Sequence, residues 1–336
     1  MITYQDYPPF VVEDIVRIRR RIAGSQVPQK RLDDNLLIAT WNLRGFGRVY
    51  PQWQENPADP KRNLRAMACI AEIIQIFDVI AVQEIKADTT ALRMLVNDFL
   101  GHDWGLVISD VTAGQRGNTE RLGFIYDRRR VQPSGLAGEI VLPPTPAGIP
   151  EQFDRTPYIV GFQAGGERFS LLTTHIRYGD APADRLPELQ AFARFTADEI
   201  LRRSGAEGEE ANLIVLGDFN IDERGSNPLF QAFVATGLTV PPALLGLRTT
   251  YNTKAKYYDQ IAWFMGGMNM LASGRAGVVD FAGAIFKELS LLQMTYRVSD
   301  HFPLWVEFIT DRSTESMAQT LGVDPAMPNA FGGVPD

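Results

Sequence analysis

Several polar side chains in this sequence come directly after short apolar runs, and their types could support acid–base chemistry. These residues, each with the run before it, are Asn42 (LLIATW), Glu84 (DVIAVQ), His175 (FSLLTT) and Asp218 (NLIVLG). A carboxylate accepts a proton, an imidazole exchanges one near neutral pH, and a carboxamide both donates and accepts hydrogen bonds. The set could therefore act together if the fold brings the ends of these runs to one place.

Three further ionisable residues stand at the start of apolar runs. Asp259 begins DQIAWF, and Asp300 and His301 come directly before FPLWVEF. In antiparallel strands the start of one strand lies beside the end of its neighbour, so we expect all seven residues to share one rim. A single Asp or Asn after a strand is most often a turn former, but Glu84 is a poor turn former, and the whole set favours a functional rim.

Apolar runs of strand length dominate the middle of the chain and predict the elements that position these residues. The runs are LLIAT, DVIAVQ, WGLVIS, LGFIY, YIVGFQ, RFSLLTT, NLIVLG, YDQIAW and PLWVEF. Apolar residues at helical spacing predict one helix after Pro60 and another after Pro187. So many strands with helices between them favour an α/β or α+β fold in which two sheets pack face to face with helices outside.

The composition indicates a globular protein and limits the kinds of partner. The chain has 336 residues, of which 45% are hydrophobic and 22% are charged, and its single cysteine, Cys69, excludes an internal disulfide framework. The net charge of −7 argues against a large nucleic-acid surface that ignores sequence, although it leaves room for a local basic cleft. Because no signal-peptide pattern or bilayer-length apolar run is visible, we expect a cytoplasmic monomer without stable membrane association, with secretion as the alternative.

The chain divides into three parts. Residues 1–34 form a helical lead-in, because apolar residues recur at helical spacing from Val11 to Ile22. Residues 35–310 form the body, which has no Gly-rich linker that would separate independent domains. Residues 311–336 are rich in small residues, Pro and Gly, and this composition predicts a flexible tail.

Five ordered motifs at the predicted strand ends carry a resemblance to a known family. The motifs TWNLRGFG, AVQEIK, LGDFNID, YDQIAW and SDHFPLWVEF resemble those of the endonuclease/exonuclease/phosphatase superfamily, and the resemblance extends from Leu36 to Phe308. This superfamily includes pancreatic-type deoxyribonuclease, abasic-site endonucleases, bacterial sphingomyelinases and inositol-polyphosphate phosphatases. The resemblance implies a four-layer sandwich of two packed mixed β-sheets flanked by helices, with the catalytic rim at one end.

The resemblance also implies a metal site and a group that acts on water. Glu84 would be the principal ligand of Mg²⁺, for which Mn²⁺ could substitute, while Asn42 and Asp300 would lie near the metal. Hard oxygen donors are what Mg²⁺ prefers, so this donor set is chemically sensible. Asp218 would orient or deprotonate the attacking water, and Asn220 would hold that water or a phosphate oxygen.

Two acid–imidazole pairs follow from the same resemblance. His301 would contact the scissile phosphate, while Asp259 orients its ring and favours its positive charge. In the deoxyribonuclease-like branch a Glu pairs with a second His, so Glu120 would pair with His175 beside the substrate phosphate. Arg155, in an R-x-P context, would contact that phosphate directly.

The motifs therefore favour a Mg²⁺-dependent phosphodiesterase, with nuclease action on DNA or RNA as the leading hypothesis. One position departs from the deoxyribonuclease-like branch, because that branch has a DNA-contacting Tyr two positions before the Glu and this chain has Asn118. A phospholipid hydrolase of the sphingomyelinase type or an inositol-phosphate hydrolase could use the same rim. A further alternative is a non-catalytic binding protein of the same fold, which would predict at least one broken rim position.

Overall fold

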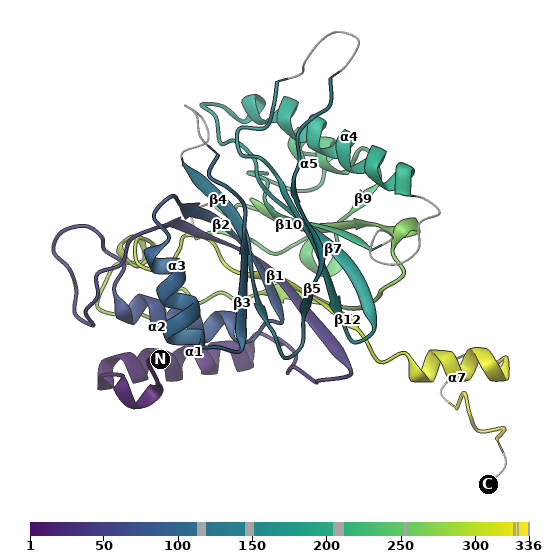
Figure 1. Cartoon of the computed structure of the whole chain (residues 1–336), viewed down its shortest axis with the longest axis horizontal. Coiled ribbons are helices and arrows are strands. Elements are labelled where there is room, and N and C mark those ends of the chain that lie inside the picture. The colour runs from purple at the N-terminus through teal and green to yellow at the C-terminus, as the bar shows by residue number, and fades with distance from the viewer. Residues whose placement is uncertain are drawn as a thin grey trace.

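The structure, a computed structural model, contains two mixed β-sheets that pack face to face, with helices on the outer sides (Figure 1). It describes residues 1–112, 119–144, 151–203, 212–251, 254–324, 327 and 329–334. The predicted architecture of two packed mixed sheets flanked by helices is therefore confirmed. Asn118 lies outside the described residues.

The first sheet has the strand order β11-β12-β1-β2-β4-β3. Its strands are β1 (Asn35–Phe46), β2 (Val79–Lys86), β3 (Trp104–Ile108), β4 (Glu120–Asp127), β11 (Leu271–Val278) and β12 (Leu304–Ile309). β1 and β2 run parallel, and the other neighbouring pairs are antiparallel. The C-terminal ends of β1 and β2 therefore point to the same rim of the sheet.

The second sheet has the strand order β5-β6-β7-β8-β10-β9. Its strands are β5 (Gln132–Glu139), β6 (Tyr158–Ala164), β7 (Glu167–His175), β8 (Leu213–Asp218), β9 (Leu238–Thr239) and β10 (Asp259–Phe264). β7 and β8 run parallel, whereas the other neighbouring pairs are antiparallel. Each sheet thus has one central parallel pair, and the carboxyl ends of such strands are where α/β folds place their sites.

The two sheets bury a large apolar core between them. β1 and β2 face β7, β8 and β10 across this interface. Ile38, Val79 and Leu216 belong to the core between the sheets, while Leu37 and Ile80 belong to a second core under the helices of the first sheet. Neighbouring residues of one strand enter different cores because side chains alternate between the two faces of a strand that is buried on both.

Helices cover both outer faces of the pair of sheets. α1 (Pro9–Gly24), α2 (Leu64–Ile74) and α3 (Thr90–Met94) lie beside the first sheet, and α4 (Leu186–Arg203) and α5 (Pro228–Val234) lie beside the second (Figure 1). The helices predicted in the lead-in, after Pro60 and at Pro187 are confirmed as α1, α2 and α4. Asn63 begins α2 as its N-cap, since its side chain accepts a hydrogen bond from the backbone N–H of Ala66 at 3.0 Å.

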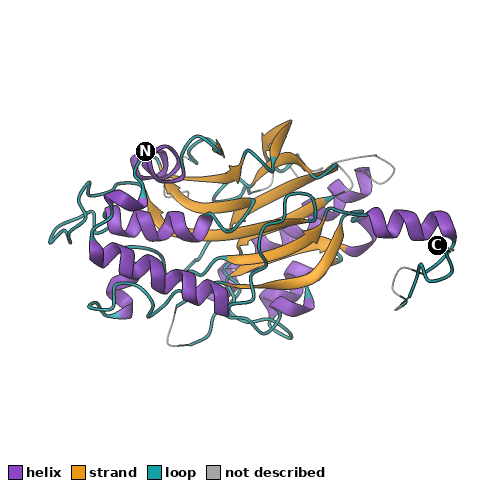
Figure 2. Ribbon diagram, turned by 90° about the horizontal axis from the view of Figure 1, so that it is seen from below, coloured by secondary structure: helices purple, strands orange, loops and turns teal. Residues whose placement is uncertain are grey.

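Further helical segments lie between these elements and at both ends of the chain. They are η1 (Tyr4–Asp6), η2 (Leu95–Leu100), η3 (Pro182–Arg185), η5 (Pro242–Leu244), η6 (Met265–Gly267), α6 (Leu291–Thr295) and α7 (Ser313–Leu321). α7 stands away from the two sheets (Figures 1 and 2), so the segment predicted as a tail contains a helix that its composition did not predict. Among the described helices, none combines the length and apolar character needed to cross a membrane.

Three of the described strands were not predicted from the sequence, and all three are at sheet edges. β5 and β9 end the second sheet, and β11 ends the first. β5 (QPSGLAGE) and β11 (LASGRAGV) are rich in Gly and small residues and lack the apolar alternation of the central strands. An edge strand pairs on one side and buries less surface, so its sequence need not carry the apolar pattern that reveals a central strand.

Candidate active site

Residues from both sheets meet at one rim, which is formed by the C-terminal ends of the two parallel strand pairs. β1 contributes Asn42 and β2 contributes Glu84, whereas β7 and β8 end at His175 and Asp218. In the second sheet, Asp218 is directly opposite His175 on one side and Asp259 on the other. Hydrogen bonds and close contacts connect these side chains, so the predicted residues do share one rim.

Asn42 joins the two sheets at this rim. Its Nδ2 donates to Glu84 Oε1 at 3.0 Å and to Asp218 Oδ2 at 2.9 Å. Its Oδ1 accepts a hydrogen bond from the backbone N–H of Arg44 at 2.8 Å. The side chain is fully buried with both polar atoms satisfied, so it holds the two carboxylates in a fixed relation. In this arrangement Asn42 is a hydrogen-bond donor to the carboxylates and presents no oxygen to them.

Asp218 is buried, and donors surround its carboxylate. Nε2 of His175 is 3.5 Å from Oδ2, and Nε2 of His301 is 3.7 Å from the same oxygen. The backbone N–H of Asn220 donates to Oδ1 at 2.9 Å. Burial alone would raise the pKa of Asp218, but the two imidazoles and the amide of Asn42 outweigh burial and lower it. Asp218 is therefore ionised at neutral pH and can accept a proton.

His301 and Asp259 form a buried acid–imidazole pair. Nδ1 of His301 lies 2.8 Å from Asp259 Oδ2. Burial opposes the charge on the ring, but the carboxylates of Asp259 and Asp218 raise the pKa of His301 to about 10. Its backbone is fixed as well, since its N–H donates to Ser299 Oγ at 3.0 Å and its carbonyl accepts from Trp41 Nε1 at 2.8 Å. His301 is thus an oriented, positively charged donor at neutral pH.

Glu120 binds three basic side chains, and we call this group the Glu120 cluster. Its Oε2 lies 3.0 Å from His175 Nδ1 and accepts a hydrogen bond from Arg155 Nε at 2.6 Å. Its Oε1 accepts from Lys86 Nζ at 2.9 Å. Burial opposes ionisation, but the hydrogen bond and charge of His175, with Arg155 and Lys86, hold the pKa of Glu120 well below its usual range. Because Glu120 belongs to the first sheet and His175 to the second, this cluster is another bridge between the sheets.

Two predicted site residues, Asn220 and Asp300, contact the other rim residues less directly. The side chain of Asn220 turns its Nδ2 to the carbonyl of Ile176 at 2.7 Å, while its backbone N–H bonds Asp218. Asp300 pairs with Arg44, whose Nη1 lies 3.4 Å from Oδ2. Asn220 therefore reaches the site mainly through its backbone, and Asp300 is linked to the other rim residues through Arg44.

Three non-glycine residues at the rim have backbone conformations that most residues avoid. Arg44, Glu84 and Asn220 have φ angles of 44°, 60° and 50°. The pairing of β2 with both of its neighbours shifts register next to Glu84, which marks a β-bulge that redirects a side chain. Backbone strain of this kind persists where surrounding contacts enforce it, and it is common at functional sites.

Glu84 is the carboxylate that could hold a metal ion at this rim. Its Oε1 accepts from Asn42, and its Oε2 accepts from the backbone N–H of Gly45 at 2.7 Å, so each oxygen keeps capacity for a further partner. Asp300 is 35% exposed and adds a second carboxylate. Mg²⁺ retains several waters and needs one or two protein carboxylates, so these donors fit it in type and number. The described residues contain no cluster of three or more His, Cys, Asp or Glu arranged for a metal.

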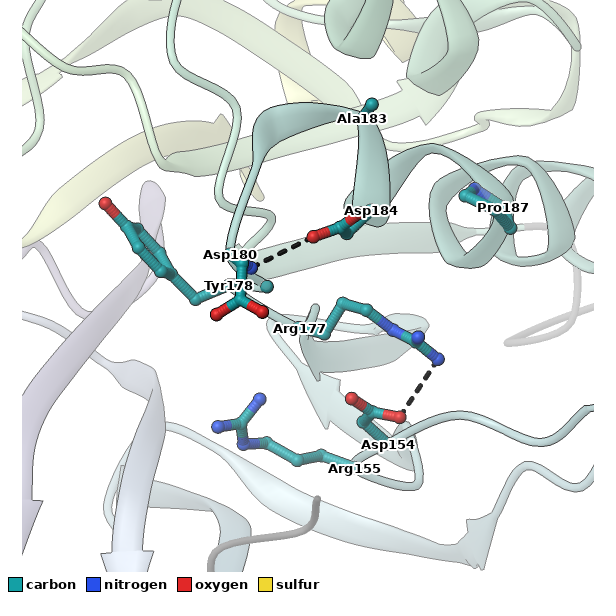
Figure 3. A pocket seen from close by; sticks show the side chains of 9 residues that line it. Asp154, Arg155, Arg177, Tyr178, Asp180, Ala183, Asp184 and Pro187 are labelled. Carbon is teal, nitrogen blue, oxygen red and sulfur yellow. Dashed lines mark hydrogen bonds and ion pairs between the residues drawn. The ribbon is translucent and has the colours of Figure 1, made fainter.

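A cavity of about 610 Å³ opens beside the Glu120 cluster (Figure 3). Arg155 and Arg177 both line it, but their partners differ. Arg177 is turned to Asp154, with an Nη2–Oδ1 distance of 3.0 Å, and also bonds Glu188. The guanidinium of Arg155 lies in the cavity while its Nε is bound to Glu120, so its remaining N–H groups suit an anion there.

Three residues of the site were not predicted from the sequence. Lys86 and Arg44 stand two positions after Glu84 and Asn42, the spacing at which strand residues return to the same face, and this spacing was the available signal. Ser299 acts through backbone groups, since its Oγ donates to the carbonyl of Asn42 at 2.6 Å. A contact of that kind leaves no recognisable pattern in a sequence.

Residues 39–301 match the sequence profile of the Endonuclease/Exonuclease/phosphatase family. This range covers most of the chain and contains the rim residues from Asn42 to His301. The chain belongs to the endonuclease/exonuclease/phosphatase family. The resemblance inferred from the motifs is confirmed, and the activities in the family's name are all hydrolyses of phosphate esters.

Individual members of the family extend this comparison. A protein named deoxyribonuclease from Thioalkalivibrio sp. is 27% identical over 294 residues, which cover 84% of this chain and 73% of that protein. A solved mannosyl-6-phosphatase from Bacteroides thetaiotaomicron has a TM-score of 0.54 and 17% identity, over 81% of this chain and 99% of its own. Humanized D. rerio TDP2 has a TM-score of 0.52 and 16% identity, over 82% and 98%. At such identities the solved structures show the shared fold alone.

Proposed function

We propose that this member of the endonuclease/exonuclease/phosphatase family is a divalent-metal-dependent phosphodiesterase that hydrolyses the backbone of nucleic acids. The observation that carries the proposal is the group around Asp218, a buried carboxylate flanked by His175, His301 and Asn42. The similarity to a protein named deoxyribonuclease over 84% of the chain supports nucleic acid as the substrate. D. rerio TDP2, which shares the fold at a TM-score of 0.52, was solved with a single-strand DNA product.

Asp218 would act on the attacking water. It is ionised at neutral pH, and hydrogen bonds from Asn42 and from the backbone of Asn220 fix both carboxylate oxygens. A fixed acceptor can orient a water molecule and take its proton as the new bond to phosphorus forms. Asn220 stands beside this acceptor in a strained backbone conformation. Its carboxamide oxygen can accept a hydrogen bond from the water, and the N–H of Nδ2 that is not bonded to Ile176 can donate to a phosphate oxygen.

His301 and Arg155 would act on the phosphate group. His301 is protonated at neutral pH, and Asp259 fixes its ring so that Nε2 is the remaining donor. That donor can bond a phosphate oxygen and stabilise the negative charge that grows in the transition state. Arg155 and His175, both held by Glu120, supply further donors from the neighbouring part of the rim.

Glu84 and Asp300 would hold a divalent cation, with Mg²⁺ as the first candidate and Mn²⁺ as a substitute. When bound, this cation would neutralise charge on a phosphoryl oxygen. Asn42 and the Gly45 N–H orient Glu84 by hydrogen bonds to its two oxygens, so the carboxylate is preorganised for binding. Glu84 is therefore the residue whose removal should abolish metal-dependent turnover.

The proposal can be tested with purified protein and a panel of substrates. Single- and double-stranded DNA and RNA, together with phosphomonoesters, are incubated with Mg²⁺, Mn²⁺ or EDTA. We expect cleavage of polynucleotides with either cation, no cleavage with EDTA, and a loss of roughly 100-fold or more in Glu84→Ala. His102→Gln is the control, because the His102 side chain is 88% exposed and belongs to no part of the site.

Two outcomes would reject the proposal. If wild-type protein leaves every polynucleotide uncut, or if Glu84→Ala cuts as fast as wild type, the rim is not a metal-dependent nuclease centre. Release of inorganic phosphate from the monoesters, without any cleavage of polynucleotides, would assign the rim to a phosphatase.

A further inference from the structure

Two exposed tyrosines, Tyr178 and Tyr296, flank the catalytic rim, and neither belongs to its acid–base or metal groups. We propose that they are base-stacking platforms, so that the site takes a single-stranded polynucleotide that continues on both sides of the cleaved bond. This inference rests on the proposed nuclease function. It adds the form of the substrate and places the cut inside the strand.

Tyr178 is 56% exposed and lies in the loop that follows β7. The guanidinium of Arg185 stacks on its ring at 4.4 Å from the centroid. Arg185 is itself held firmly, since its Nε donates to the Tyr178 carbonyl at 2.7 Å and its Nη1 to the Asn220 carbonyl at 2.6 Å. The ring is therefore fixed from one side by a buried cation while much of its surface faces the solvent.

Ring contacts connect Tyr178 with the catalytic imidazole. Its ring packs edge-on against Tyr258, with centroids 6.2 Å apart, and the ring of Tyr258 lies 6.0 Å from that of His301. Tyr178 also lines the cavity that contains the guanidinium of Arg155 (Figure 3). A base on Tyr178 would thus belong to a nucleotide next to the phosphate that Arg155 and His301 are proposed to bind.

Tyr296 has a matching position on the other side of the rim. It is 52% exposed, and the guanidinium of Arg44 stacks on its ring at 4.0 Å from the centroid. Arg44 also pairs with Asp300 at 3.4 Å, and its backbone N–H donates to Asn42. Tyr296 lines a second cavity together with Glu84, the proposed metal ligand. Arg44 therefore contacts both this aromatic ring and Asp300, one of the two proposed metal ligands.

The two cavities belong to different sheets and adjoin the same rim. The cavity of Tyr178 is formed mainly by the loop after β7 of the second sheet. That of Tyr296 is formed by the ends of β1 and β2 of the first sheet, the loops after them and the turn after α6. Glu120 links them, because it accepts a hydrogen bond from Arg155 of one cavity and from Lys86 of the other. A strand that crosses the rim would therefore meet one tyrosine before the cleaved bond and the other after it.

Base stacking on these two tyrosine rings favours a single-stranded polynucleotide over a duplex. An exposed aromatic ring stacks on nucleobases of any sequence, and this stacking needs a base whose π-face is open. In a duplex each base is stacked between its neighbours and offers no open face to a side chain. The second cavity also has five basic and three acidic side chains in its lining, which suits the phosphates of a continuing strand.

The test uses short DNA strands that contain one natural linkage at the centre, with phosphorothioate linkages elsewhere. The same strands with natural linkages throughout show whether cleavage occurs inside the strand or at its ends. A nucleotide on the 5′ or the 3′ side of that linkage is replaced by an abasic tetrahydrofuran residue, and the intact strand is also supplied as a duplex. The variants are Tyr178→Ala, Tyr296→Ala and the two Phe substitutions. Tyr4→Ala is the matched control, since Tyr4 is 49% exposed and carries Arg19 on its ring at 4.9 Å, and its hydroxyl bonds Glu72 on α2 rather than a rim residue.

We expect wild-type protein to cut the single strand internally and faster than the duplex. Each Ala variant should lower kcat/KM on the intact strand roughly tenfold, while the Phe variants and Tyr4→Ala stay near wild type. Each Ala variant should also show no further loss on the substrate that lacks the matching base. This last readout separates stacking from a structural effect, because a distorted site would slow all substrates alike.

Three results would overturn the inference alone: Ala variants as active as wild type, the same loss on intact and abasic strands, or cleavage restricted to strand ends or duplexes. If wild-type protein cuts no polynucleotide at all, the proposed nuclease function fails, and this inference fails with it.

Discussion

Asn42 and Asp218 are 176 positions apart in the chain, yet a hydrogen bond of 2.9 Å joins their side chains across the two sheets. The same Nδ2 atom donates to Glu84 at 3.0 Å. One carboxamide thus sets the relation between the proposed metal ligand and the proposed base. Because the three side chains come from β1, β2 and β8, the site exists only when both sheets are correctly packed.

The first prediction concerns this carboxamide. Asn42→Ala removes a donor shared by two carboxylates, so Glu84 and Asp218 would repel each other without a bridge. We expect kcat/KM to fall roughly 100-fold and the free energy of unfolding to fall by about 2 kcal/mol. Hydrolysis rates and urea unfolding measure the two effects, with the exposed Asn97→Ala as control. Unchanged activity in Asn42→Ala would show that the bridge has no role in catalysis.

The second prediction concerns the pH dependence of activity. Asp259 and Asp218 raise the pKa of His301 to about 10, so wild-type activity should be lost as His301 deprotonates around that pH. Asp259→Asn removes one of these carboxylates, and the alkaline limb of kcat/KM should move to lower pH. A pH–rate profile of both proteins checks the shift. An alkaline limb at the same pH in both would contradict the assigned role of Asp259.

The third prediction concerns the pH dependence of stability. The pKa of His301 is higher in the folded protein, about 10, than its ordinary value of 6.5, so its protonation favours the folded state. This contribution is complete below about pH 6.5 and is lost as the pH rises through about 10. The difference in free energy of unfolding between wild type and His301→Gln should therefore shrink across that range. A difference that stays constant from pH 6 to 10 would contradict it.

The fourth prediction concerns the parallel pair that carries His175 and Asp218. A Cβ added at Gly217 would lie 2.2 Å from the carbonyl oxygen of Thr174 on β7, and Gly217 has φ of 145°. Gly217→Ala should therefore lower the free energy of unfolding by about 3 kcal/mol and reduce activity. Gly246→Ala is the matched control, since no atom lies within 4 Å of a Cβ there. Equal unfolding midpoints for the two variants would contradict the close approach of the strands.

The fifth prediction concerns cation binding, measured without any substrate. If Glu84 holds Mg²⁺ or Mn²⁺, the cation should raise the Tm of wild type by roughly 3 °C at about tenfold excess over its Kd. Glu84→Ala should show no such rise, whereas Glu13→Ala should behave as wild type because Glu13 is exposed on α1. The same rise in Glu84→Ala would place the cation elsewhere.

The central strands and the rim could be predicted from the sequence because these strands are apolar runs, and several of them have an ionisable or amide group directly at one end. Glu84 and His175 were found in this way, since neither is an ordinary turn residue after an apolar run. The contacts of Lys86 and Arg155 with Glu120 could not be predicted, because the first depends on the register between β2 and β4 and the second on the position of a loop. The hydrogen-bonding direction of Asn42 likewise depends on neighbours that are distant in the chain.

The roles assigned to individual residues remain predictions, as do the boundaries of the lead-in and tail. The family resemblance implied that Asn42 lies near the metal as a possible ligand, whereas the structure turns its Nδ2 to both carboxylates. An amide in this position can fix Glu84 without coordinating the cation itself. The variants of Asn42 and Glu84 distinguish these two roles, because Tm shifts with the cation should survive in Asn42→Ala only if Asn42 is no ligand.

The most direct measurement is the rate at which wild type and Asp218→Asn cleave single-stranded DNA in Mg²⁺. Asp218→Asn keeps the shape of the side chain but removes the carboxylate that both imidazoles face. We expect wild type to cleave the strand and Asp218→Asn to be at least about 100-fold slower while it remains folded. Equal rates for the two proteins would contradict a hydrolytic centre built around Asp218.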